Sequence, residues 1–162
     1  MKKAFTAVAV LLLLAGCSGP DDPASSLVSF FDAVKAGKGS HAVAYLSQDA
    51  LDSLAAGMDL AELKLNPDSS SAALAAYGIA LTPEEVSAVT IDILLERMIE
   101  SPLFLGMMEE ASLEVGEVSV AGSQAMVNAT VVFLGDTTSG TVEMVLEGNN
   151  WKITGEGLRF AL

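Results

Sequence analysis

The periodicity of apolar residues changes once along this chain, near residue 112, and that change constrains the fold more than any other feature of the sequence. Before it, apolar residues recur at three- and four-residue spacing, which is typical of amphipathic helices. After it, apolar and polar residues alternate, as at Ala125, Val127 and Ala129, which predicts strands with one buried face. Helices followed by an antiparallel meander predict an α+β domain.

Start and stop signals divide the helical part. Asp22 and Pro23 form an N-cap and first-turn proline, and Gly37 predicts the end of that helix. Ser40 and Ser47 are expected to cap two further helices. Residues 66–71 are expected to form a break or loop. A capping box over residues 82–85 predicts a helix that continues to about residue 100.

The alternating part divides at its turn residues. The first strand is expected over residues 113–120, with a bulge at Gly116. Turns are expected at residues 121–124, 135–140 and 147–150, and a last strand opens with Trp151 and Ile153.

Composition excludes several classes of protein. The chain has 162 residues and is 51% hydrophobic, so intrinsic disorder and several domains are both excluded. Only 8 Lys and Arg face 21 Asp and Glu, a net charge of −13, which excludes nucleic-acid binding. One Cys and one His exclude a disulfide framework and a clustered metal site. His41 is the only His, and the sequence indicates no acidic residue that would orient it as a general base. We assign no catalytic residue, metal or cofactor.

The N-terminus has the pattern of a secretory signal. Lys2 and Lys3 precede an apolar run over residues 4–14, which is shorter than the roughly 20 residues of a permanent membrane span. The run ends in Leu14-Ala15-Gly16-Cys17, which resembles the lipobox of bacterial lipoproteins. The resemblance implies cleavage before Cys17 and attachment of a diacylglycerol to the Cys17 sulfur through a thioether, which anchors the protein to a membrane.

This resemblance sets the domain boundaries. We expect a signal peptide at 1–16, a lipidated tether at 17–23 and a single α+β domain at 24–162. Ser18, rather than Asp, follows the lipidated residue, and the lipoprotein sorting rule then implies the periplasmic face of the outer membrane in a Gram-negative cell. The expected location is therefore the cell envelope.

Three segments of the domain resemble a second family. They are the opening helix with Phe30-Phe31, the next helix with Tyr45 and Leu46-Ser47, and the closing run 147–153. Together they resemble the nuclear transport factor 2-like superfamily, in its branch of uncharacterised bacterial lipoproteins. The resemblance implies helices packed on a curved antiparallel sheet, a cone that often holds a pocket. Residues 51–111 are longer and more apolar than the family pattern and are expected to form a helical insert.

Two candidate binding surfaces follow. A pocket within the cone is a candidate for a small apolar ligand, and the alternative for its residues is ordinary core packing. The outer sheet face is a candidate surface for an envelope protein or a second copy of the chain. The candidate pocket residues are Tyr45, Phe104, Met107, Met108 and Trp151, and those of the outer face are Met126, Val132, Leu134 and Val145.

The sequence favours a binding or accessory module without catalytic activity, held at the envelope by its lipid. A structural or assembly role in the envelope is the first alternative. An isomerase or dehydratase, activities found within the superfamily, is the second, because a shared fold does not fix function.

Overall fold

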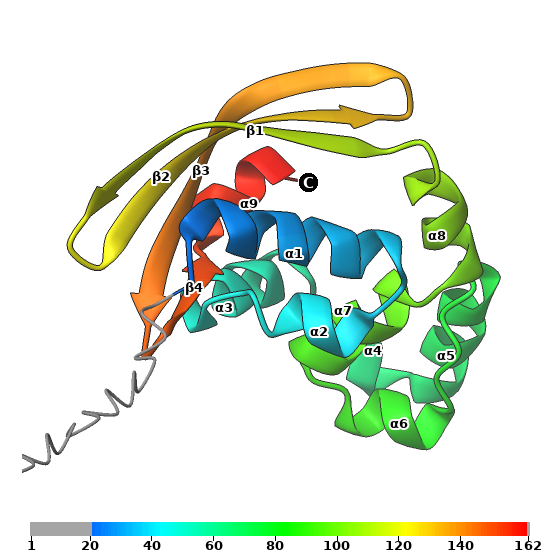
Figure 1. The fold of residues 1–162 in the computed structure, drawn as a ribbon. Coiled ribbons are helices and arrows are strands. Elements are labelled where there is room, and N and C mark those ends of the chain that lie inside the picture. Colours follow the sequence, from blue (N-terminus) through cyan, green and yellow to red (C-terminus); the bar gives the residue numbers. More distant parts are fainter. Residues whose placement is uncertain (1–20, 162) are drawn as a thin grey trace, which may run out of the picture.

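The computed structural model describes residues 21–161 of the chain, with side chains to residue 158, and shows an α+β fold. The lipobox residues, including Cys17, and the signal peptide lie outside the described residues. In Figure 1 the sheet arches over α1, and helices α4, α5 and α6 form a group at the other end of the molecule. The helices are α1 (Pro23–Lys35), α2 (Gly39–Val43), α3 (Gln48–Gly57), α4 (Leu60–Leu65), α5 (Pro67–Ala76), α6 (Pro83–Ala88), α7 (Ile91–Ile99), α8 (Pro102–Met108) and α9 (Gly155–Ala161).

The sheet is an open antiparallel meander in the order β1-β2-β3-β4. The pairing of β1 with β2 shifts register between Val115 and Val118, which confirms the bulge expected at Gly116. The turn expected over residues 135–140 is wrong in extent. Leu134 and Gly135 alone make it, with φ of 51° and 86°, and β3 starts at Asp136. The strands are β1 (Ser112–Ala121), β2 (Gln124–Phe133), β3 (Asp136–Glu147) and β4 (Asn150–Ile153).

The helix caps follow the sequence in most places. The Asp22 side chain accepts a hydrogen bond from the backbone N–H of Ser25 at 3.0 Å, so α1 starts as expected. Ser47 caps α3 in the same way. Ser40 does not cap α2, because that helix already begins at Gly39 and Ser40 lies inside it. Gly39 comes so close to α7 that a Cβ there would lie 2.6 Å from the Cα of Glu96.

Two segments of the helical insert differ from expectation. Residues 66–71 do not form a loop, because Pro67 occupies the first turn of α5 and the break is limited to Asn66. The helix expected from residue 83 to about 100 is divided into α6 and α7 at Val89 and Thr90. Both residues are β-branched, which weakens a helix, and extended backbone at Val89 lets its side chain be fully buried.

The capping box at the start of α6 is confirmed. The backbone N–H of Thr82 donates to Glu85 Oε2 at 2.7 Å, and the N–H of Glu85 donates to Thr82 Oγ1 at 3.2 Å. The hydrogen bond from the Thr82 backbone stabilises the charged carboxylate and holds the pKa of Glu85 below its ordinary value of 4.5.

The buried apolar residues form two cores. The large core lies between the inner face of the sheet and helices α1, α2, α7 and α9, and it includes Met144, Trp151 and Ile153. The small core lies within the helical insert and consists of five buried residues, with partly buried leucines of α4 and α5 around them. These five residues are Ile79, Leu81, Val86, Val89 and Leu94.

Helix α9 was not expected from the sequence, and it covers part of a sheet edge. β4 pairs with β3 only over residues 144–147, which leaves the rest of that edge of β3 without a strand. The backbone N–H of Thr154 donates to the carbonyl of Glu143 at 3.0 Å, just beyond the last pair. Gly157 follows so closely that a Cβ on it would overlap the Glu143 backbone. The short β4 thus brings α9 against β3 and limits the exposed edge.

Candidate functional site

The outer face of the sheet, which points away from α1, is built from cross-strand rows. One row is Ser119, Met126 and Glu143, and the next is Ala121, Gln124 and Val145. The intervening residues on the same strands, such as Val127 and Met144, are buried in the large core. The alternation that fills the core therefore places the side chains of these rows on the outer face.

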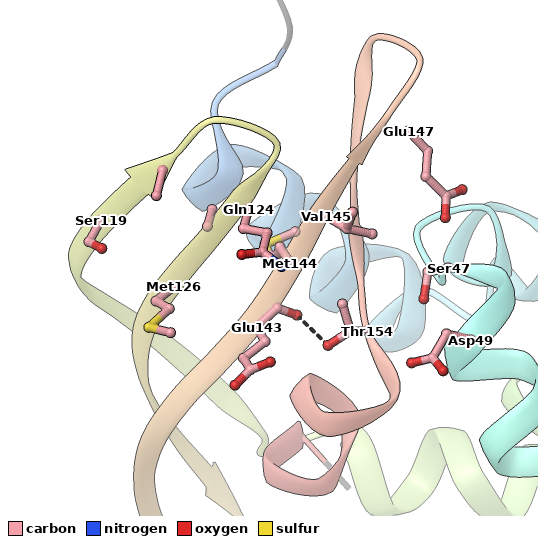
Figure 2. A pocket seen from close by; sticks show the side chains of 12 residues that line it. Ser47, Asp49, Ser119, Gln124, Met126, Glu143, Met144, Val145, Glu147 and Thr154 are labelled. Atoms are coloured by element: carbon pink, nitrogen blue, oxygen red, sulfur yellow. Dashed lines mark hydrogen bonds between the residues drawn. The ribbon is translucent and has the colours of Figure 1, made fainter.

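These two rows form the floor of a hollow in the surface with a volume of about 390 Å³, which we call the first hollow. Met126 is its most prominent apolar group and is 54% exposed, and Val145 beside it is half-buried. Because the two lie in neighbouring rows, they make a small apolar patch beside the polar side chains of Ser119, Gln124 and Glu143. Figure 2 shows this part of the sheet with the side chains of Ser119, Gln124, Met126, Glu143 and Val145.

The wall of the first hollow comes from helix ends beyond the sheet. Asp49 lies in the first turn of α3, and its Oδ2 accepts a hydrogen bond from the backbone N–H of Gly155 at 3.2 Å. Thr154 donates its hydroxyl to the carbonyl of Glu143 at 3.2 Å and accepts from the N–H of Gly157 at 3.2 Å. These bonds hold the starts of α3 and α9 against β3, so the wall is fixed in place (Figure 2).

The charged groups around the first hollow are mostly acidic. Glu147 forms an ion pair with Lys152 at 3.3 Å, and Asp49 is already bonded to the Gly155 backbone. Glu143 is exposed, and no side chain in the described part of the chain pairs with its carboxylate. Glu143 is therefore the carboxylate most available to a ligand.

A second hollow, also of about 390 Å³, continues along the same face. Its lining includes the polar side chains of Glu114, Asn128 and Thr130. Two side-chain hydrogen bonds cross from β2 to β3 here: Thr130 Oγ1 with Ser139 Oγ at 2.8 Å, and Thr141 Oγ1 to Asn128 Oδ1 at 2.9 Å. Because Asn128 follows Met126 on the same face of β2, the two hollows are neighbours along the strand.

The five residues predicted to line a pocket lie in or near the large core. Trp151 and Met108 are buried there, and Tyr45 and Phe104 are half-buried against it. Met107, also half-buried, lies beside Met108 on α8. Neither hollow of the outer face contains any of the five.

The four residues predicted for the outer face fall into two groups. Met126 and Val145 line the first hollow. Val132 is half-buried in the row with Ser112 and Thr137, at the far end of the sheet. Leu134 is not on the sheet face, because it lies in the turn between β2 and β3, where it is 65% exposed.

Sequence reasoning did not identify Asp49, Glu143, Glu147 or Thr154 as site residues. Asp49 and Thr154 reach the site only because α3 and α9 meet, and no local pattern indicates that meeting. The alternation of residues along β3 predicts that Glu143 points outward. Its position opposite Met126 depends on the register between β2 and β3, which the alternation does not give.

Among residues 21–161, no helix is long and apolar enough to cross a membrane. The same residues contain no group of three His, Cys, Asp or Glu side chains arranged to hold a metal ion.

No protein-family model matches the sequence, and neither a curated protein nor a solved structure matches it.

Proposed function

We propose that this chain is a lipid-anchored binding module of the cell envelope, without catalytic activity, that docks an envelope protein on the outer face of its sheet. The observation that carries the proposal is the first hollow, where an exposed Met126 lies between polar side chains on a wall and floor fixed by backbone hydrogen bonds. A pre-formed surface of this kind binds with little cost in conformational entropy.

The shape of the site favours a protein over a small apolar ligand. Pockets for small ligands are concave and enclose most of the ligand. The two hollows instead lie side by side on an exposed sheet face with hydroxyl, amide and carboxylate groups. A face with an apolar centre and a polar surround is typical of a protein interface.

The anchor and the fold family are part of the same proposal. The lipobox Leu14-Ala15-Gly16-Cys17 supports attachment through lipid on Cys17, and Ser18 supports the outer membrane in a Gram-negative cell. The packing of α1 inside a curved antiparallel meander supports a variant of the nuclear transport factor 2-like cone (Figure 1).

Photo-crosslinking in intact cells of the source organism tests the docking function. A photo-reactive amino acid is placed at Ser119 in the first hollow, at Ser139 in the second, and at the exposed Ala73 of α5 as a control. We expect Ser119 and Ser139 to give an adduct of the same discrete mass, and Ala73 to give none. No adduct from the outer face, or the same adduct from Ala73, would exclude the outer face as the docking site.

Mass spectrometry of the protein extracted from the membrane tests the anchor. We expect an N-terminal peptide that begins at Cys17 and carries acyl chains, and a Cys17→Ala variant that lacks them. An unmodified Cys17 in the membrane-bound protein would contradict the lipid anchor.

A further inference from the structure

We infer that the partner presents a basic, extended segment to the outer face, with an apolar side chain between its basic residues. This inference rests on the proposed docking function and adds the chemistry of the partner. It is carried by the arrangement of the first hollow, where an apolar patch has carboxylates on more than one side.

The charges at the first hollow select for a cation. Asp49, Glu143 and Glu147 line it, and Lys152, the base next to it among residues 21–158, is paired with Glu147. A basic side chain placed beside Met126 would reach Glu143 in the same row, where that carboxylate has no partner among the described residues. Opposite charges brought together at an interface give specificity and speed association.

The floor of the hollow selects for an apolar group beside that cation. Met126 and Val145 are neighbours across β2 and β3, and an unbranched methionine adapts to side chains of different shape. An apolar side chain placed here would remove the exposed surface of Met126 from water.

The second hollow indicates that the segment is extended. Successive residues on one face of a strand are about 6.8 Å apart, so Met126, Asn128 and Thr130 make a path along β2. The path leads from the apolar patch to hydroxyl and amide groups that can bond to a peptide backbone. Glu114, at the far end of this path, provides a further carboxylate for a basic residue.

The same charges argue against the other occupants of this face. A second copy of the chain would bring Glu143 and Glu147 toward equally acidic surfaces, which costs binding energy. Anionic lipid headgroups and nucleic acid are repelled by a chain of net charge −13. A basic segment of another protein is the occupant that the charges favour.

Calorimetric titration of the full-length chain in a non-ionic detergent tests the inference. The probe is the heptapeptide Ser-Lys-Ser-Leu-Ser-Lys-Ser, in which the two lysines and the central leucine share one face of an extended chain. A Glu143→Gln/Glu147→Gln variant is compared with a Glu62→Gln/Glu84→Gln variant, which makes the same change of charge on exposed residues of the helical insert. We expect the first variant to weaken binding about tenfold and the second less than twofold, because salt at about 0.15 M screens charges beyond about 8 Å.

The apolar contact has its own control. Replacing the central leucine of the probe by serine is expected to weaken binding to the wild-type chain, and to have no further effect on a Met126→Ser variant. A probe with glutamate in place of lysine is expected not to bind. Circular dichroism confirms that each variant is folded before titration.

The outcomes separate this inference from the proposed function. Equal weakening by the two double variants, or binding of the glutamate probe, would overturn the basic segment. So would a Ser119 adduct that forms in the Glu143→Gln/Glu147→Gln variant as efficiently as in the wild type, although docking on the outer face would then stand. Absence of a Ser119 adduct in wild-type cells would overturn the docking function itself.

Discussion

The two cores of this molecule are stabilised in different ways. The large core joins segments from both ends of the chain, since α1 and β4 pack in the same layer of side chains. The small core is made within residues 79–94, and no residue of α4 or α5 is fully buried around it. The large core thus depends on contacts between distant segments, and the small core on a few buried side chains and on helix caps such as the one at Thr82.

The sheet and the helical insert therefore need not unfold together. Regions with few buried apolar contacts open with lower free energy than the rest of a domain. The helical insert has this character, and the outer face of the sheet does not belong to it. Changes in the small core should therefore leave the proposed docking face intact. Four substitutions and one control test how separate the two cores are.

The largest effect is expected for Trp151→Ala in the large core. Trp151 is 3% exposed on the short β4, and its removal leaves a cavity that the surrounding strands cannot fill. The free energy of unfolding should fall by about 4 kcal/mol. Urea unfolding followed by circular dichroism measures it, and the sheet and helices should lose stability together. A loss confined to the helical insert would contradict the assignment of Trp151 to the large core.

The next effect is expected for Gly39→Ala, at the contact between α2 and α7. A Cβ here would lie 2.6 Å from the Cα of Glu96, so the two helices must move apart. Because α7 provides residues to both cores, both should be destabilised, by about 3 kcal/mol.

Gly57→Ala is the matched control for this substitution. No atom lies within 4 Å of a Cβ at Gly57, so alanine should be neutral or slightly stabilising at the end of α3. Thermal unfolding of the two variants makes the comparison. Equal melting temperatures would show that α2 and α7 do not pack as closely as described.

A smaller and more local effect is expected for Leu94→Ala. Leu94 is 5% exposed in the small core, and truncation should cost about 2 kcal/mol there. Hydrogen exchange should show faster exchange of the α6 and α7 amides, while amides of β2 and β3 keep their protection. Uniform acceleration across the sheet would mean that the two cores unfold as one unit.

The smallest effect is expected for Glu85→Gln in the capping box. The pKa of Glu85 is lowered in the folded state by the Thr82 backbone hydrogen bond, so the charge contributes stability above the ordinary pKa of 4.5. That contribution is lost as the pH falls through the folded-state pKa. The variant should therefore be less stable than the wild type at about pH 6, and the difference should shrink at about pH 3. A difference that grows on acidification would contradict the lowered pKa.

Much of the fold could be predicted because local rules decide it. The caps at Asp22, Ser47 and Thr82 are satisfied by hydrogen bonds within three residues, and alternation gave the buried face of β2. The division at Val89 could not be predicted, because it depends on burial in the small core. Helix α9 could not be predicted either, because its position depends on the bond of Thr154 to Glu143 and on the bond of Gly155 to Asp49, 106 positions away in sequence.

The candidate site was less predictable than the fold. Met126 and Val145 were expected on the outer face from alternation alone, and the structure places both in the first hollow. The wall was not expected, because Asp49 and Thr154 meet only through tertiary packing. The sequence does not distinguish apolar residues that line a pocket from apolar residues that fill a core. In the structure Trp151 belongs to the large core.

The bond between Gly155 and Asp49 has a consequence for the order of folding. It joins residues 106 positions apart, and the residues next to Gly155 supply Trp151, Ile153 and Leu158 to the large core. A chain is synthesised from its N-terminus, and long-range contacts slow folding. The α6–α7 segment has its partners nearby and can form early, whereas β3 has to wait for β4 and α9 before its edge is covered. The arrival of β4 and α9 therefore sets the time at which the sheet becomes native.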